Sequence, residues 1–262
     1  MPEPLHTASF PVLGTVLGIS SPLPRRELDA AARGVSLMLA GYLGAGSGRS
    51  LQAQIDAVAI GSLALEDSSQ TVRSLHRLAL HWRERTLGAF TPGERYPELA
   101  GLLRPYLMGQ AASVLLDFGI PHWAVNLGGD IACSGSPTPS VPTGSDPFYG
   151  TPWRAGITDP FGPGLLLADV PLAGTPGFTA ALATSAGTPA STYRQVSVLG
   201  PDIVEADVLA TAILSGGADV LRAALAGSPV QVLAVHHDGA LEASTRWPTY
   251  ATEPAAPGAP PY

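Results

Sequence analysis

The chain has 262 residues, of which 45% are hydrophobic and only 13% are charged, so it can bury a large core and is not mostly disordered. Its formal net charge of -7 argues against a general nucleic-acid binder and against a basic membrane-binding patch. All 14 basic residues are arginines, and the absence of lysine excludes mechanisms that use a P-loop lysine, a Schiff base or a lysine general base.

The single cysteine, Cys133, cannot form an intramolecular disulfide, and no zinc-ligand spacing surrounds it. The N-terminal residues lack the basic start and apolar run of a signal peptide, and no stretch reaches the ~18 uninterrupted apolar residues of a membrane span. We therefore expect a cytoplasmic protein with no membrane segment and no nucleic-acid partner. Its oligomeric state is left open.

The first half of the chain is predicted to contain an opening strand and three helices. Residues Phe10–Ile19 are β-rich and broken by glycines, which predicts one strand with a kink or a close backbone approach at Gly14. Apolar residues at helical spacing, with caps and breakers, predict the helices. They cover Arg25–Leu43, a segment from the N-cap at Ser68 or Ser69 to Gly88, and Leu99–Phe118.

The second half is predicted to contain mostly strands. His122–Asn126 is a short strand, Gly135–Pro152 is a surface loop rich in Pro, Gly, Ser and Thr, and three strands of a meander follow. These three strands and the later elements are Trp153–Thr158, Leu165–Val170, Gly177–Ala183, a strand Arg194–Leu199, helices Val204–Leu214 and Ala218–Leu225, and a strand Val230–His236. The sequence thus predicts a single α+β layered domain over 1–251, with a mixed or antiparallel sheet flanked by helices, and a flexible Pro/Ala-rich tail over 252–262.

A carboxylate and a hydroxyl, Asp207 and Thr211, are the densest chemical signal. On a helix they stand at i and i+4, so they lie on one face of an otherwise apolar segment. Two such oxygens suit a hard cation such as Mg²⁺, which completes its shell with waters and substrate phosphates. The alternative is structural: Asp207 stabilises the first helical turn, and Thr211 bonds back to a backbone carbonyl.

Two further segments offer oxygen-binding groups. Asn126–Asp130 places a glycine pair after a strand, where backbone N–H groups can hold phosphate or carbonyl oxygens. It lacks a full dinucleotide fingerprint, and a turn in which Asp130 bonds its own loop is the alternative. The turn Thr184–Thr188 is rich in hydroxyls and either binds phosphate or is only a loop.

Seven short motifs together resemble the ApbE-like FAD:protein FMN transferases, which move FMN from FAD onto a protein threonine. They occur in the same order across nearly the whole chain. They are Leu13-Gly14-Thr15 for M-G-T, Thr86–Phe90 for T-x-G-A-F, Met108–Ala111 for K-G-Y-A, Val125–Ile131 for V-N-L-G-G-D-I, Pro152–Ile157 for P-W-x-V-G-I, Ala183–Ser185 for A-T-S-G, and Glu205–Ala212 for E-A-D-A-L-A-T-A.

The resemblance implies an ApbE-like α+β fold that holds FAD in a cleft, with Asp207 and Thr211 binding Mg²⁺. FAD is then the substrate, AMP is released and an acceptor protein receives FMN. No catalytic residue is assigned. The flavin-binding residues implied by the motifs are Leu13, Gly14, Thr15, Ala89, Phe90, Gly109, Gly128, Gly129, Asp130, Thr184 and Ser185.

The departures from the family pattern indicate a divergent, shortened member. Met108 replaces a lysine or acidic residue, Thr91 replaces an aspartate, and Leu102–Pro105 replaces D-L-G-G. The H-x-x-D-P-x-T-G segment is missing, because only Ala186–Tyr193 separates Ser185 from the next strand. Two hypotheses follow: a Mg²⁺-dependent FAD:protein FMN transferase, at full or weakened activity, or a diverted, non-catalytic ApbE-like protein that binds flavin or another small molecule in a less polar pocket.

Overall fold

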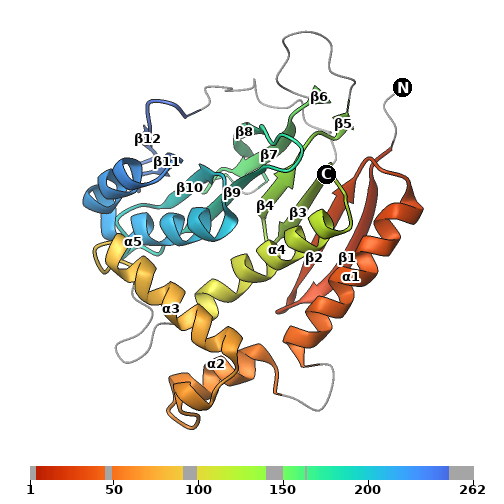
Figure 1. Ribbon diagram of the computed structural model, residues 1–262. Helices are drawn as coiled ribbons and strands as arrows, with labels where there is room; N and C mark the ends of the chain where they lie inside the picture. Colours follow the sequence, from red (N-terminus) through yellow and green to blue (C-terminus); the bar gives the residue numbers. More distant parts are fainter. Residues whose placement is uncertain (1–3, 45–48, 91–98, 140–149, 163, 248–262) are drawn as a thin grey trace.

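The computed structural model describes residues 4–44, 49–90, 99–139, 150–162 and 164–247. Its centre is an eight-stranded sheet in which every neighbouring pair of strands is antiparallel (Figure 1). In spatial order the strands are β1 (His6–Val12), β2 (Thr15–Ser21), β3 (Trp123–Leu127), β4 (Asp130–Ser134), β9 (Thr179–Ala186), β10 (Gln195–Gly200), β11 (Gln231–Val235) and β12 (Leu241–Ala243). The predicted α+β class is confirmed.

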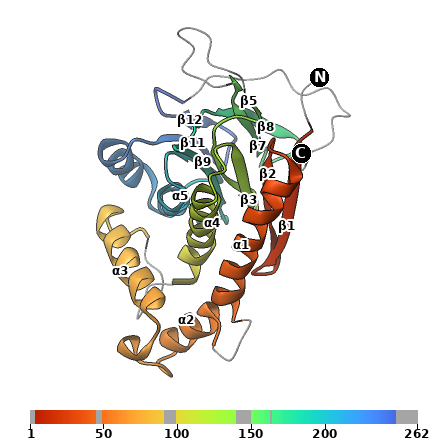
Figure 2. The same ribbon diagram turned by 45° about the vertical axis from the view of Figure 1, so that its right-hand side comes forward.

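Three helices pack on one face of this sheet, namely α1 (Arg25–Leu43), α4 (Leu99–Asp117) and α5 (Ile203–Gly227). The shorter helices α2 (Leu51–Ala59) and α3 (Gln70–Arg85), with the 3₁₀ turn η1 (Leu65–Asp67) between them, extend past the lower end of the sheet (Figures 1 and 2). The predicted bounds of α1 are confirmed at both ends. The helix ends at Leu43 because Gly44 adopts the left-handed conformation, and the Gly44 N–H donates to the carbonyl of Ala40.

Helix α2 was not predicted, although its sequence carries the signals of a helix. The hydroxyl of Ser50 accepts a hydrogen bond from the backbone N–H of Ala53, which caps the helix start. Leu51, Ile55 and Val58 are buried at helical spacing. The segment between the first two predicted helices, to which the sequence analysis assigned no element, therefore contains a helix of its own.

The opening strand is also different from its prediction. Instead of one kinked strand over Phe10–Ile19, β1 and β2 form a hairpin in which Val12 pairs with Thr15. Leu13 and Gly14 make the two-residue turn, and both have positive φ angles, 49° and 77°. Tight hairpin turns require this conformation, so the glycine marks a reversal of the chain and not a kink.

The predicted three-strand meander is wrong in its third strand. β7 (Trp153–Thr158) and β8 (Leu166–Leu172) pair as a separate two-stranded sheet, whereas β9 lies between β4 and β10 in the main sheet. Within the predicted surface loop, the two-residue strands β5 (Thr138–Pro139) and β6 (Gly150–Thr151) also pair. The β9 sequence explains its central place, since consecutive residues such as Ala181 and Leu182 are apolar and buried on opposite faces.

The main sheet is buried on both faces along its central strands. Residues facing the helices, such as Ala132 and Ala234, belong to a large core with α1 to α5. Their strand neighbours Cys133 and Leu233 point the other way, into a smaller core formed with β7 and β8. The alternation has the period of two expected for strands. Cys133 is fully buried there, as expected for a packing residue.

Helix α5 bends sharply at a glycine pair. Gly217 has φ 70° and ψ −151°, a conformation outside the helical region, so two helical segments meet there, as predicted. The carbonyl of Leu214 accepts hydrogen bonds from the N–H groups of Thr192 and Tyr193, at 3.0 and 3.3 Å. The hydroxyl of Thr192 donates to the carbonyl of Ser215 at 2.9 Å. These bonds satisfy carbonyls that the bend removes from the helical ladder.

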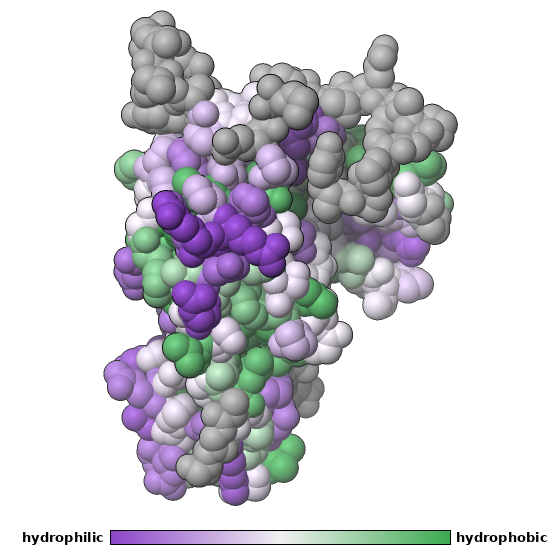
Figure 3. Space-filling model, turned by 90° about the vertical axis from the view of Figure 1, so that its right-hand side faces the viewer, coloured by the Kyte–Doolittle hydropathy of each residue, from purple (hydrophilic) through white to green (hydrophobic). Residues whose placement is uncertain are grey.

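Two helices, α4 and α5, are long and apolar enough to cross a membrane by length and composition. About half of each apolar window, 50% and 56%, is buried inside the protein, so packing against the sheet accounts for their composition. On the α1 side of the molecule (Figure 3), hydrophilic surface gathers in the upper part and hydrophobic patches lie below it. The first half of α1 accordingly exposes charged side chains, including Arg25, Arg26 and Asp29.

Candidate functional site

The start of α5 is held by acidic residues other than Asp207. The side chain of Asp202 is the N-cap and accepts a hydrogen bond from the N–H of Glu205 at 2.8 Å. Glu205 accepts from the hydroxyl of Ser228 at 2.7 Å and lies 3.5 Å from the guanidinium of Arg85. Because these residues stabilise the helix start, the structural alternative is not needed to explain Asp207.

Thr211 lies one turn after Asp207, and its hydroxyl meets a strand of the sheet. Its Oγ1 lies 3.0 Å from the hydroxyl oxygen of Ser185 on β9, and this contact joins the helix to the strand. The preceding residue, Thr184, donates its backbone N–H to the carboxylate of Asp130 at 3.0 Å. The Thr184 hydroxyl pairs with the hydroxyl of Ser197 on β10 at 2.9 Å. The first part of the segment predicted as a turn, residues 184–186, is therefore the end of β9, and Gly187 and Thr188 follow the strand.

Asp130 begins β4 directly after the glycine pair. Gly128 and Gly129 have φ angles of 69° and 104°, as a tight hairpin turn between β3 and β4 requires. The carboxylate of Asp130 reaches β9, whereas it is the side chain of Asn126 that accepts a bond within the turn, from the N–H of Gly129 at 3.4 Å. The alternative in which Asp130 bonds only its own loop is wrong.

Asp130 and Asp207 are close enough that the charge of Asp130 affects the ionisation of Asp207. The pKa of Asp207 is raised to about 7, mainly by burial and also by the charge of Asp130, against the lowering effect of the Arg104 guanidinium. Burial also raises the pKa of Asp130 to about 6, against the lowering effects of the Thr184 N–H and of Arg104. Partly buried carboxyl groups whose pKa values are raised are a common feature of ligand sites.

Arg104 is the residue of this site that the sequence reasoning missed. It lies on α4, and its Nη1 atom is 3.8 Å from the position that a Cβ atom at Gly128 would occupy. The resemblance treated this position only as a departure from D-L-G-G. The available signal is the residue type, because an arginine between Leu103 and Pro105 in a chain of net charge -7 is a candidate for binding an anionic ligand.

These residues form one cluster at an end of the sheet, and we term this cluster the carboxylate corner. It contains Arg104, Gly128, Gly129, Asp130, Thr184, Ser185, Asp207 and Thr211. Arg104, Gly128, Gly129, Thr184 and Thr211 are exposed, so solvent reaches the corner. The structure thus brings together the acid and alcohol of α5 with the paired glycines, as expected from the sequence.

The donor set of the carboxylate corner fits a hard cation. Carboxylate oxygens of Asp130 and Asp207 and hydroxyl oxygens of Ser185 and Thr211 are the ligand types that Mg²⁺ prefers, and softer donors are lacking among them. Within the described ranges, no group of three or more His, Cys, Asp or Glu residues could hold a metal. A divalent ion here would therefore rely on two carboxylates, hydroxyls and other oxygens.

Other predicted binding residues have different positions. The hairpin turn of Leu13, Gly14 and Thr15 lies at the same end of the sheet as the glycine pair, because Leu17 of β2 pairs with Leu127 of β3 in antiparallel register.

Ala89 and Phe90 follow α3, where the buried Thr86 hydroxyl donates to the carbonyl of Trp82 and accepts from the N–H of Phe90. Phe90 is in the large core, and Gly109 is in the middle of α4. Among the described residues, no hydrogen bond or ion pair links these three to the carboxylate corner.

The departures from the family pattern have structural roles. Met108 is fully buried in the large core, and Thr91 lies outside the described residues. The short segment in place of the missing motif supports the bend of α5 through Thr192 and Tyr193. The hydroxyl of Tyr193 also donates to Glu242 on β12 at 2.9 Å.

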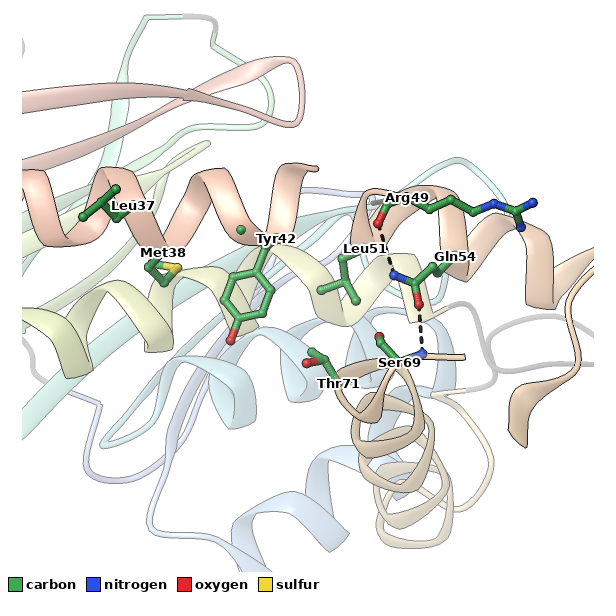
Figure 4. A pocket seen from close by; sticks show the side chains of 9 residues that line it. Leu37, Met38, Tyr42, Arg49, Leu51, Gln54, Ser69 and Thr71 are labelled. Atoms are coloured by element: carbon green, nitrogen blue, oxygen red, sulfur yellow. Dashed lines mark hydrogen bonds between the residues drawn. The ribbon is translucent and has the colours of Figure 1, made fainter. Parts of the chain in front are cut away.

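A groove with a cavity volume of about 360 Å³ lies elsewhere, between α1, α2 and the start of α3 (Figure 4). Figure 4 shows Leu37, Met38 and Tyr42 on one side, and the Gln54 side chain bridging Arg49 and Ser69 by hydrogen bonds of 3.2 and 2.9 Å. None of the predicted site residues lines this groove. Geometry and chemistry therefore favour the carboxylate corner as the candidate site.

Comparison with known proteins agrees with the sequence motifs. Residues 66–188 match the ApbE family. A solved ApbE protein from Thermotoga maritima superposes with a TM-score of 0.70 and 19% identity, over 95% of this chain and 100% of that chain. A flavin transferase ApbE from Vibrio cholerae gives 0.66 and 17%, over 93% and 99%. The apo form of a flavinyl transferase ApbE from Pseudomonas stutzeri gives 0.64 and 15%, over 94% and 97%.

A search of curated proteins found no match. The low identities agree with the expected divergence, and the coverage means that this chain spans practically the whole length of the matched structures. The residues that match the ApbE family cover slightly less than half of this chain, and the solved structures confirm the predicted ApbE-like fold.

Proposed function

We propose that this chain, which is similar to the ApbE family over residues 66–188 and shares the fold of solved ApbE structures, is a Mg²⁺-dependent FAD:protein FMN transferase. The single observation that carries the proposal is the carboxylate corner, in which Asp207, Thr211 and Asp130 meet beside the Gly128–Gly129 turn. Fold similarity alone is a weak warrant for chemistry, whereas this set of oxygens has a specific use in phosphoryl transfer.

In the proposed reaction, the acceptor hydroxyl loses its proton to solvent and forms a new P–O bond to the FMN phosphorus, and the P–O bond to the leaving AMP breaks. Asp207 and Thr211 would hold the ion, with Asp130 and Ser185 beside them. When bound, Mg²⁺ neutralises diphosphate charge and makes AMP a better leaving group.

The chain's own residues provide the positioning. The Thr184 N–H fixes the carboxylate of Asp130, and the Ser185–Thr211 contact fixes β9 against α5. The glycine pair adds no side chain at the exposed turn, which leaves room for a nucleotide.

The direct test is to incubate the purified protein with FAD, Mg²⁺ and a threonine-containing acceptor peptide. We expect AMP release and a flavin-labelled peptide. Asp207→Asn and Thr211→Val should each lower the rate at least about 100-fold, as for removal of a group that stabilises a transferring phosphoryl. Thr211→Ser, which keeps the hydroxyl, should retain most of the activity.

Asp202→Asn is the matched control on the same helix, because asparagine caps α5 as well as aspartate does and the substitution does not touch the corner. Calorimetric titration with Mg²⁺ gives a readout that is independent of activity. If the wild-type protein binds FAD but yields neither AMP nor labelled peptide, the alternative of a diverted flavin-binding protein is correct, and the transferase proposal fails.

A further inference from the structure

Arg104 has a place in the carboxylate corner that the proposed Mg²⁺ chemistry does not use. It is exposed, and its Nη1 is directed toward Gly128, with 3.8 Å to the position of a Cβ there. Its charge acts on both Asp130 and Asp207. Within the described part of the chain, Arg104 makes no ion pair within 4.0 Å and no side-chain hydrogen bond.

This arrangement is unusual for an arginine near two acids. Other arginines with an acidic neighbour form contacts, as Arg154 does with Asp169 at 2.8 Å. The guanidinium of Arg104 instead keeps its hydrogen-bond donors available on the solvent side. A planar guanidinium with free donors matches the oxygens of a phosphate better than any other side chain.

The charge balance of the corner also requires a cation on this side. A diphosphate that approaches two carboxylates is repelled by them, and this Coulomb repulsion is substantial at short distances. The glycine turn offers no side-chain charge of its own, so Arg104 supplies the positive charge next to the turn. Helix α4 holds the residue in place, since the neighbouring Leu103 and Pro105 are buried in the protein.

We propose that Arg104 is the diphosphate-binding side chain of this site, so that phosphate-bearing nucleotides bind the carboxylate corner even without a divalent cation. The inference rests on the proposed function only for the identity of the nucleotide as a flavin. The inference applies to any ligand that carries a diphosphate group. This group is held between Arg104 and the Gly128–Gly129 turn, while Asp207 and Thr211 take part in the transfer step.

The test uses calorimetric titration of the full-length protein in EDTA with pyrophosphate and ADP, and fluorescence titration with FMN and riboflavin. We expect Arg104→Gln to weaken binding of pyrophosphate, ADP and FMN by about 10- to 100-fold, the usual range for loss of a charge-assisted hydrogen bond. Riboflavin has no phosphate, so its affinity should change less than about twofold. Arg104→Lys should fall between the wild-type protein and Arg104→Gln, because it keeps the charge but loses the fork.

Arg33→Gln is the matched control, since it removes another exposed arginine on a helix, α1, that does not carry a corner residue. Circular dichroism and thermal melts verify that each variant is folded. The proposal is overturned if Arg104→Gln binds ADP and pyrophosphate as the wild-type protein does, or if wild-type binding is absent in EDTA. Arg104-dependent ADP binding without FAD turnover would refute the proposed function alone. FAD turnover with an unchanged Arg104→Gln would refute the present inference alone.

Discussion

Replacing Asp207 with asparagine should stabilise the metal-free protein at alkaline pH. The pKa of Asp207 in the folded chain is about 7, whereas an aspartate in an unfolded chain titrates near ~3.9. A difference of roughly 3 units at about 1.4 kcal/mol each gives an upper value of about 4 kcal/mol. Part of this energy is shared with Asp130, so we expect a gain of roughly 2 to 4 kcal/mol.

The sign follows from proton linkage. Below about pH 4, Asp207 is protonated in both the folded and the unfolded state, and its burial costs no ionisation energy. As the pH rises toward 7, the unfolded chain releases the proton first, so the free energy of unfolding falls. The asparagine side chain of the variant has no proton to release in this range, and the stability gain of the variant should therefore grow between pH 4 and pH 7 and stay constant above it.

The assay is urea denaturation in EDTA at pH 4.5 and at pH 8, with the free energy of unfolding obtained by linear extrapolation. Asp202→Asn on the same helix should show no gain at pH 8, and a small loss is expected because the charge at the helix start is removed. Millimolar Mg²⁺ should stabilise the wild-type protein more than the Asp207→Asn variant. The reasoning is refuted if Asp207→Asn is no more stable than the wild-type protein at pH 8, or if its gain is equal at both pH values.

Two other substitutions test structural elements outside the carboxylate corner. Thr86→Val leaves the buried N–H of Phe90 without its acceptor and should lower the free energy of unfolding by about 1–3 kcal/mol. Thr86→Ser keeps the hydroxyl and should lower it less. Urea denaturation measures both variants, and equal stabilities would contradict the role assigned to the hydroxyl. Gly217→Ala forces a side chain into a positive φ of 70° and against Thr192, so we expect a loss of at least about 1–3 kcal/mol in the same assay, and a neutral effect would contradict the bend.

Apart from α2, the helices of the described residues and the position of Asp207 and Thr211 on one helix could be predicted from the sequence, because their signals are local. The apolar stripe and glycine stop of α1, and the serine cap of α3, each lie within a single segment. The spacing of Asp207 and Thr211 is also local, and it places both on one helix face. Their meeting with Asp130 depends on strand pairing across more than fifty residues, which the motif order suggested but the spacing alone could not fix.

The misplaced strands show where local patterns stop being informative. A glycine inside a β-rich segment is typical both of a hairpin turn and of a kink in one strand. The sequence therefore could not distinguish the Leu13–Gly14 turn from a kink. The place of β9 depends on which neighbours bury its two apolar faces, a tertiary property. Arg104 was missed for the same reason, since nothing near it in the sequence indicates that α4 passes the glycine pair.

The segment that contains β5 to β8 leaves and re-enters the main sheet at one point, because Ser134 at the end of β4 pairs with Thr179 at the start of β9. The carboxylate corner lies at the opposite ends of these two strands. This excursion could therefore be lengthened, trimmed or exchanged between relatives while the strand register beneath the corner is retained. The side chains of Cys133 and Leu182 are covered by this segment, so a shortened segment would expose them to solvent first. Exposed apolar surface of this kind lowers solubility. Variation in this part of the protein would therefore affect solubility before it alters the geometry of the carboxylate corner.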